Sequence, residues 1–527
     1  MRTASKLTFG ILPLLVSGFG GFNRSFERKC ASFANSLHVP RGQVVLTEFV
    51  PAGSVIEFPD SEPSCNRTSQ AVTTDLCRVA LTVETSHRSG IYMESWLPKS
   101  WTGRFLSTGN GGLGGCIQYE DVEYATSLGF AAVGTNNGHD GMSGEYYLYN
   151  EDVLEDYVYR ALHTGVVVGK EVTKSFYQRP YTKSYYLGCS SGGRQGLKEA
   201  QDFPDDFDGI VVGDPAINFN NLTSWSCHFL PLTGTEGSPT FVPLDMWPTI
   251  HEDILAQCDG LDGVLDGVIE VPDLCNYTPD GLICAPGETG ACLTSTQADT
   301  VRGIYSPLFG EDGSFSYPRM PPGTEGTEAV AAYYGGTPFD ESDWFRYVVF
   351  NDSNWDPESL VPENYTTASN QNPFNVETWN GDLSPLQEKG VKLLHYHGSV
   401  DGIISSEVSP MYYEHVSQTM KLSADELDDF YRFFRIAGMG HCSDGPGASF
   451  IGNTKKTLAS LDPDENVLMA MVRWVEQDVA PETITGTSFV NGTQSAGVGF
   501  KRAHCRYPRE NVYQSGDPNL ASSWSCE

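Results

Sequence analysis

A strand, a glycine-rich turn and a helix follow one another between residues 184 and 201, and this stretch constrains the fold most strongly. The apolar run SYYLGCS (184–190) is typical of a buried strand, and GGRQGLKEAQ (192–201) has helical periodicity. The turn between them reads G-x-S-x-G around Ser190. In a chain with 55 glycines this pattern alone is weak. Its position between a strand and a helix predicts an exposed, nucleophilic serine on an α/β fold.

The rest of the chain also alternates between strand-like and helix-like segments, which indicates an α/β fold with a largely parallel sheet. We expect one such domain, assembled from residues 21–215 and 391–527. Its predicted strands lie within residues 91–98, 103–109, 129–136, 184–190, 207–216, 391–398 and 430–441, and its predicted helices within 158–176, 192–201 and 466–477.

Between residues 216 and 390 the alternation stops. The sequence there is rich in glycine, proline, aspartate and aromatic residues, and it holds five closely grouped cysteines. An insertion of roughly 175 residues has the size of an independent domain. We therefore expect a lid domain over residues 216–390, inserted between the two parts of the α/β domain.

The N-terminus is typical of a secreted protein. A basic start, MRTASK, precedes an apolar stretch too short to span a bilayer, so residues 1–20 are interpreted as a signal peptide, with a buried strand as the alternative. The 13 cysteines and the glycosylation sequons also favour an oxidising, extracellular location. The sequons begin at Asn23, Asn66, Asn221, Asn276, Asn351, Asn364 and Asn491.

Charge and cysteine spacing argue against several classes of function. With 67 acidic and 33 basic residues the net charge is −34, which repels nucleic acid and anionic membrane surfaces. No segment after the leader is long and apolar enough for a membrane helix. The cysteines lack metal-ligand spacing, so we expect disulfides, and their odd number leaves at least one thiol unpaired. The sequence does not determine the oligomeric state.

Two further residues complete a catalytic triad with Ser190. Acyl transfer by a serine needs an acid and a histidine, which follow it in that order in the α/β-hydrolase fold. Asp401 follows one predicted strand, in HYHGSVDG, and His441 lies after another, in GMGHCSDGPG. Ordinary explanations remain open for residues of these motifs. Ser190 could be a helix cap, Asp401 a turn former, and the nearby His397 a buried core histidine.

Cysteines stand directly beside two members of the proposed triad. Cys189 precedes Ser190, and Cys442 follows His441. A disulfide between these cysteines would hold the two catalytic loops together and restrict the unfolded chain strongly. A free buried thiol is the alternative. At the start of the helix, the Ser191 amide would lie near a developing oxyanion.

These residues resemble the secreted fungal tannase and feruloyl esterase family, and most of all the type B feruloyl esterases. The resemblance runs over nearly the whole chain after the leader. Its motifs are STGNGGLGGC (107–116), GTNNGHDG (134–141), SYYLGCSSGGRQG (184–196), QNPFN (371–375), FYRFFRIAGMGHC (430–442) and HCRYP (504–508).

The resemblance implies specific roles. Ser190 would be the nucleophile, His441 the general base and then acid, and Asp401 the residue that orients the imidazole. The second oxyanion donor would come from residues 109–112, where we choose the Gly112 amide. The implied disulfides leave Cys227 unpaired and are Cys189–Cys442, Cys30–Cys77, Cys65–Cys116, Cys258–Cys275, Cys284–Cys292 and Cys505–Cys526.

The segment CDGLDGVLDGVIEVPDLC (258–275) carries a candidate metal site. Asp259, Asp262 and Asp266 alternate with glycines and can direct hard oxygen ligands at one Ca²⁺, although the segment is not an EF-hand. The resemblance implies a structural calcium to which Val264 and Val268 add their carbonyls. Aspartate–glycine turns without an ion are the alternative. We expect no organic cofactor.

We therefore predict a secreted serine carboxylesterase that hydrolyses feruloyl (hydroxycinnamoyl) esters of plant cell-wall polysaccharides through an acyl-enzyme. A tannase acting on galloyl esters is the alternative. A peptidase with the same triad, or a wall-binding protein without activity, is a weaker alternative.

Overall fold

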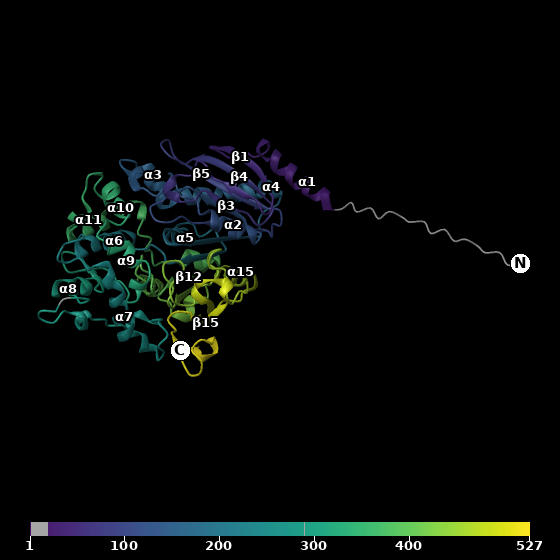
Figure 1. Cartoon of the computed structure of the whole chain (residues 1–527). Coiled ribbons are helices and arrows are strands. Elements are labelled where there is room, and N and C mark those ends of the chain that lie inside the picture. Colours follow the sequence, from purple (N-terminus) through teal and green to yellow (C-terminus); the bar gives the residue numbers. More distant parts are fainter. Residues whose placement is uncertain (2–18, 289) are drawn as a thin grey trace.

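A nine-stranded mixed sheet forms the centre of the protein (Figure 1). The computed structural model describes Met1 and residues 19–288 and 290–527. The predicted leader, residues 1–20, therefore lies almost wholly outside the described residues. In sheet order the strands are β1 (Gly42–Val50), β4 (Leu76–Glu84), β5 (Gly90–Pro98), β7 (Ala131–Thr135), β6 (Arg104–Thr108), β8 (Lys183–Cys189), β9 (Gly209–Gly213), β12 (Lys392–Gly398) and β13 (Tyr431–Ile436).

The sheet is parallel over six strands, from β7 to β13, which confirms the predicted α/β architecture. The other three strands, β1, β4 and β5, form an antiparallel edge. Sequence periodicity did not predict β1 and β4. The edge strand β1 is half-exposed, whereas β4 is almost wholly buried. The two paired strands therefore carry different patterns of apolar and polar residues.

Helices cover both faces of the sheet. Successive side chains of a strand point to opposite faces. In β8, Tyr185 and Leu187 therefore join one hydrophobic core, and Tyr186 joins the other. The core beside Tyr186 packs under α4 (Ala161–Tyr177) and α5 (Ser191–Asp202), and the opposite core packs under α2 (Tyr119–Ser127) and α15 (Val467–Gln477).

The remaining elements outside the insertion are short or lie at the periphery. The helices are α1 (Phe19–Ser32), α3 (Glu151–Glu155), α13 (Val408–Met420) and α14 (Ala424–Leu427). Among the described residues, three strand pairs lie outside both the main sheet and the insertion: β2 (Val55–Glu57) with β3 (Ser69–Ala71), β14 (Thr483–Phe489) with β15 (Val498–Cys505), and β16 (Asn511–Tyr513) with β17 (Trp524–Cys526).

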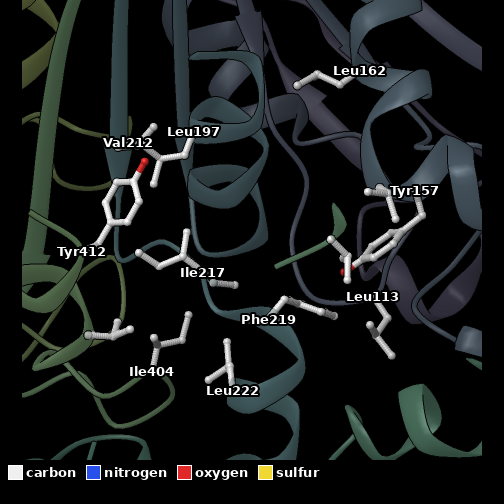
Figure 2. Packing of buried hydrophobic residues seen from close by; sticks show 14 of the residues in the cluster. Leu113, Tyr157, Leu162, Leu197, Val212, Ile217, Phe219, Leu222, Ile404 and Tyr412 are labelled. Atoms are coloured by element: carbon white, nitrogen blue, oxygen red, sulfur yellow. The ribbon is translucent and has the colours of Figure 1, made fainter. Parts of the chain in front are cut away.

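Most of the regular elements in the predicted insertion are helices, and its labelled helices lie together on one side of the molecule (Figure 1). Its large aromatic side chains, including Trp225, Tyr333 and Trp344, belong to the same buried cluster as Leu197 and Val212 beside the sheet. Figure 2 shows part of this cluster. The insertion therefore shares the core of the α/β part. Its elements are α6 (Phe219–Thr233), α7 (Trp247–Cys258), α8 (Ser295–Ile304), β10 (Leu308–Phe309), β11 (Phe315–Tyr317), α9 (Ala329–Tyr333), α10 (Ser342–Trp344), α11 (Pro362–Gln371) and α12 (Ser384–Lys389).

Six disulfides connect the chain, and they are the pairs that the family resemblance implies. Cys227 is a buried free thiol. Among the described helices, none has the length and hydrophobicity needed to cross a membrane. The pairs are Cys30–Cys77, Cys65–Cys116, Cys189–Cys442, Cys258–Cys275, Cys284–Cys292 and Cys505–Cys526.

Candidate active site

Ser190 occupies a strained turn between β8 and α5. Its φ of 63° and ψ of −129° lie in a region that side-chain-bearing residues rarely adopt, so the surrounding fold must hold it there. The flanking glycines make the turn possible. A Cβ on Gly188 would lie 2.7 Å from the Gly192 carbonyl oxygen, and one on Gly192 would lie 2.9 Å from the Asn110 oxygen. The sequence G-x-S-x-G therefore follows from close backbone packing at a nucleophile elbow.

Asp401 and His441 form a hydrogen-bonded pair. The Nδ1–H of His441 donates to Asp401 Oδ2 over 2.8 Å, an arrangement that leaves His441 Nε2 available as a base. Asp401 is completely buried, and its other oxygen, Oδ1, accepts the backbone amides of Ile403 and Ile404 at 2.8 and 3.0 Å. These bonds fix the orientation of the carboxylate.

The two groups shift each other's protonation. Burial alone would raise the pKa of Asp401, but the charge of His441 and the hydrogen bonds from His397 and His441 hold it below its usual value. Burial alone would lower the pKa of His441, but the charge and hydrogen bond of Asp401 raise it to about 9. The pair therefore stabilises the imidazolium that forms when His441 accepts a proton.

The Cys189–Cys442 disulfide joins the nucleophile turn to the histidine loop. Its two Cα atoms are 6.1 Å apart, although 253 residues separate the cysteines in sequence. The residue before Ser190 and the residue after His441 are therefore covalently linked.

The loop after β6 provides free amides next to the elbow. Among the described residues of this loop, the Gly109 amide donates to Leu187 and the Asn110 amide donates to Gln195 Oε1, whereas the Gly112 amide has no such partner. Gly112 has a positive φ of 54°, and its carbonyl accepts a hydrogen bond from Tyr157. The arrangement suits the predicted choice of Gly112, together with the Ser191 amide at the start of α5.

Sequence reasoning missed a buried carboxylate beneath the triad. Asp214, directly after β9, accepts the backbone amide of Cys442 at 3.0 Å and that of Gly398 at 2.6 Å. Burial raises the pKa of Asp214 to about 6. It therefore connects the histidine loop to the end of the strand that leads to Asp401. Its place in GDPA, at the carboxyl end of a predicted strand, was the available signal.

His397 is buried, as its ordinary interpretation holds, but it also contacts the triad. Its Nε2 lies 3.2 Å from Asp401 Oδ2, and its Nδ1 lies 2.6 Å from the Ser409 hydroxyl. The Asp401 carboxylate is thus shared between two histidines.

A narrow pocket opens beside Ser190. Its volume is about 20 Å³, enough for one or two water molecules, so side chains must move to admit an aromatic acid. A larger open cavity of about 1240 Å³ lies at β4 and β5 and contains no member of the triad. The pocket beside Ser190 is lined by Ser190, Ser191, Ala216, Phe219, Leu222, Ser226, Tyr333, Phe339, Glu341, Ile403 and Ile404.

The aspartate cluster in the insertion, predicted to bind calcium, contains one buried carboxylate oxygen without a hydrogen-bond partner among the described residues. Burial raises the pKa of Asp262 to about 6, and the charges of Asp266 and Asp259 add to the increase. The buried Asp262 Oδ2 has no hydrogen-bond partner. In the described part of the chain the three carboxylates do not all approach within 4.8 Å of one another, so carbonyls such as those of Val264 and Val268 would have to complete a shell.

The predicted sequons differ in exposure. Asn221 is the least suitable, because its amide nitrogen donates to Asn218 and its oxygen accepts from Ser316 and Ser369. Asn351 and Asn364 are half-buried, and Asn23 lies outside the residues whose side chains are described. The exposed positions are Asn66, Asn276 and Asn491.

The sheet, the elbow and the Asp–His pair define an α/β-hydrolase of the serine type. A sequence profile described as "Tannase and feruloyl esterase" matches residues 77–527. The chain belongs to the tannase and feruloyl esterase family, and it is a carboxylic ester hydrolase.

Individual relatives are similar to this chain over nearly its whole length. The chain is 51% identical over 521 residues to a probable feruloyl esterase B-2 of Aspergillus terreus, covering 98% of each chain. It is 52% identical over 504 residues to a probable feruloyl esterase B of Emericella nidulans, covering 95% of each. The crystal structure of feruloyl esterase B from Aspergillus oryzae has a TM-score of 0.93 at 51% identity, covering 95% of this chain and 100% of that one. A tannin acyl hydrolase from Aspergillus niger has the same fold, with a TM-score of 0.73 at 20% identity over 93% of this chain and 92% of that one.

Proposed function

We propose that this protein is a secreted serine esterase that hydrolyses feruloyl esters of plant cell-wall polysaccharides, including xylan. The observation that carries the proposal is the Asp401–His441 pair, covalently joined to the Ser190 elbow. The nearly full-length similarity to proteins named feruloyl esterase B supports this substrate class.

The proposed mechanism uses each group for one task. Ser190 Oγ attacks the ester carbonyl while His441 Nε2 accepts its proton. The Ser191 and Gly112 amides stabilise the oxyanion. The imidazolium then donates the proton to the sugar oxygen of the ester as the carbon–oxygen bond breaks, so the sugar leaves as an alcohol and an acyl-enzyme forms. A water molecule, deprotonated by His441, releases the phenolic acid and regenerates Ser190.

The pocket lining supports a flat aromatic acid. Phe219, Leu222 and Ile404 offer apolar surfaces and lie in one packed group in Figure 2. A galloyl pocket would have to satisfy three ring hydroxyls. Besides Ser190 and Ser191, the polar side chains of this lining are Ser226, Tyr333 and Glu341, and the Tyr333 hydroxyl already donates to Ile403. We therefore favour a hydroxycinnamoyl group, which needs fewer polar partners on its ring, over a galloyl group.

Calcium would have a structural role in this proposal. Asp259, Asp262 and Asp266, with the Val264 and Val268 carbonyls, would hold the ion and order the loop 258–275. Ca²⁺ supplies charge neutralisation there and takes no part in ester hydrolysis.

The first test compares kcat/KM for methyl ferulate, methyl caffeate and methyl gallate. We expect the hydroxycinnamates to be preferred. We expect Ser190→Ala to abolish turnover while preserving the melting temperature, because it removes only the nucleophile. A preference for gallate would make the protein a tannase. Failure of a fluorophosphonate to label Ser190 in the wild-type protein would favour the non-catalytic wall-binding alternative.

A further inference from the structure

Glu341 is an unexplained polar group in the pocket beside Ser190. It lies at the start of the short helix α10 and lines this pocket together with apolar side chains. Its side chain does not cap the helix. Among the residues that the structure describes, none gives its carboxylate a side-chain hydrogen bond or an ion pair, and its buried Oε2 is unpartnered. A buried carboxylate oxygen without a partner is costly to stability.

The surroundings of Glu341 are unfavourable to its charge. Burial raises the pKa of Glu341 to about 7, and neither the hydrogen bond from its own backbone amide nor the charge of His441 offsets this. The hydroxyls of two neighbouring tyrosines are used elsewhere: Tyr157 donates to the Gly112 carbonyl, and Tyr333 donates to the Ile403 carbonyl. The only arginine within a few residues, Arg346, is paired with Asp343. Within the described part of the chain, Glu341 Oε2 is therefore open to a donor that the protein itself does not supply.

We propose that Glu341 recognises the free phenolic hydroxyl of the substrate's aromatic ring by accepting a hydrogen bond from it. This inference rests on the proposed function, because it assumes a hydroxycinnamoyl group whose ester carbon is at Ser190. Ser190 and Glu341 line the same pocket, so one ligand can reach both once side chains move to admit it. The intervening walls offer the ring apolar contacts from Phe219, Leu222 and Phe339.

A phenol suits this acceptor better than the other donors of the substrate. A phenolic O–H is a stronger donor than a sugar hydroxyl, and hydrogen bonds to a charged acceptor are stronger than neutral ones. The apolar lining also favours an aromatic ring over a hydrated sugar. Glu341 would thus determine specificity, and it would take no part in proton transfer at the ester.

The test compares three esters that differ at one ring position. Methyl p-coumarate carries a 4-hydroxyl, methyl 4-methoxycinnamate keeps the oxygen without its proton, and methyl cinnamate has neither. We expect the wild-type protein to prefer p-coumarate over both others by about 10-fold to 100-fold in kcat/KM. Glu341→Met should reduce this preference to near one, and Glu341→Gln should give an intermediate value because its amide oxygen still accepts.

The control variant is Asp340→Asn, which removes the same charge from the exposed preceding residue and should preserve the wild-type ratio. Retained activity of Glu341→Met on methyl cinnamate would show that it folds; otherwise the ratio measured for Glu341→Gln decides. Equal wild-type rates on all three esters, or an unchanged ratio in the Glu341 variants, would overturn the role of Glu341 and leave the proposed function in place. If the wild-type protein cleaves no cinnamoyl ester, the proposed function fails as well.

Discussion

At the residue scale, the shared carboxylate of Asp401 governs when His441 can act as a base. The neutral imidazole must accept the proton of Ser190, and Asp401 raises the pKa of His441 above its usual 6.5. We therefore expect kcat/KM to increase with pH through a limb whose apparent pKa exceeds 6.5. Asp401→Asn should shift that limb to lower pH and reduce kcat by about 10⁴-fold, because the correct tautomer is lost. A pH–rate profile of both proteins measures this.

The matched control for Asp401 is Asp444→Asn. Asp444 lies in the same histidine loop but is exposed and paired with Lys456. This variant should leave the limb in place. A wild-type limb at or below 6.5 would contradict the proposed coupling between Asp401 and His441.

At the scale of secondary-structure elements, the Cys189–Cys442 disulfide joins the end of β8 to the loop after β13. Replacing both cysteines with alanine removes a crosslink that closes a loop of 253 residues, worth about 5 kcal/mol in the chain-entropy model. We expect a lower melting temperature and a lower kcat, because the nucleophile and base loops are no longer joined. Calorimetry and kinetics with methyl ferulate measure the two effects.

The Cys284–Cys292 disulfide in the insertion provides the comparison. It spans only eight residues and is remote in sequence from both catalytic loops. Its double alanine variant should lose less stability and keep the wild-type kcat. Equal losses of kcat in both double variants would show that the Cys189–Cys442 bond has no particular role at the active site.

At the scale of the whole molecule, the loop 258–275, which carries the three aspartates, contacts the C-terminal part of the chain. Arg502 on β15 donates to Asp266 at 2.9 Å, so order in this loop stabilises the contact between the two. If calcium binds there, chelation should lower the melting temperature at neutral pH. Ligand linkage gives about 2.7 kcal/mol at a calcium concentration 100 times the dissociation constant.

The effect of chelation should shrink as the pH falls from 7 to 5. Without calcium, the folded-state pKa of Asp262 is about 6, above its unfolded value near 4. The folded calcium-free protein therefore binds an extra proton as the pH falls through 6, which relieves the repulsion, while proton competition weakens calcium binding. Melting curves with chelator, with and without excess calcium, measure this. An unchanged melting temperature at pH 7 would contradict the site.

The sequence by itself determined the elbow, the order Ser190, Asp401, His441 and the parallel strands that carry them. These features depend on local patterns: buried parallel strands are continuously apolar, and a sharp turn needs glycines where the backbone approaches closely. The disulfide pairs needed the family resemblance, since spacing alone allows many connectivities.

Only the tertiary structure decided what surrounds the triad. Asp214 lies far in sequence from Cys442, whose amide it accepts, and Glu341 lies far from Ser190, with which it lines the pocket. His397 is only four residues from Asp401, but that it shares Asp401 Oδ2 with His441 depends on how the loops fold. The hydrophobic core that the insertion shares with the sheet was likewise decided only by the tertiary structure. No local periodicity encodes such contacts, because burial and the lack of a partner depend on which distant elements pack against a residue.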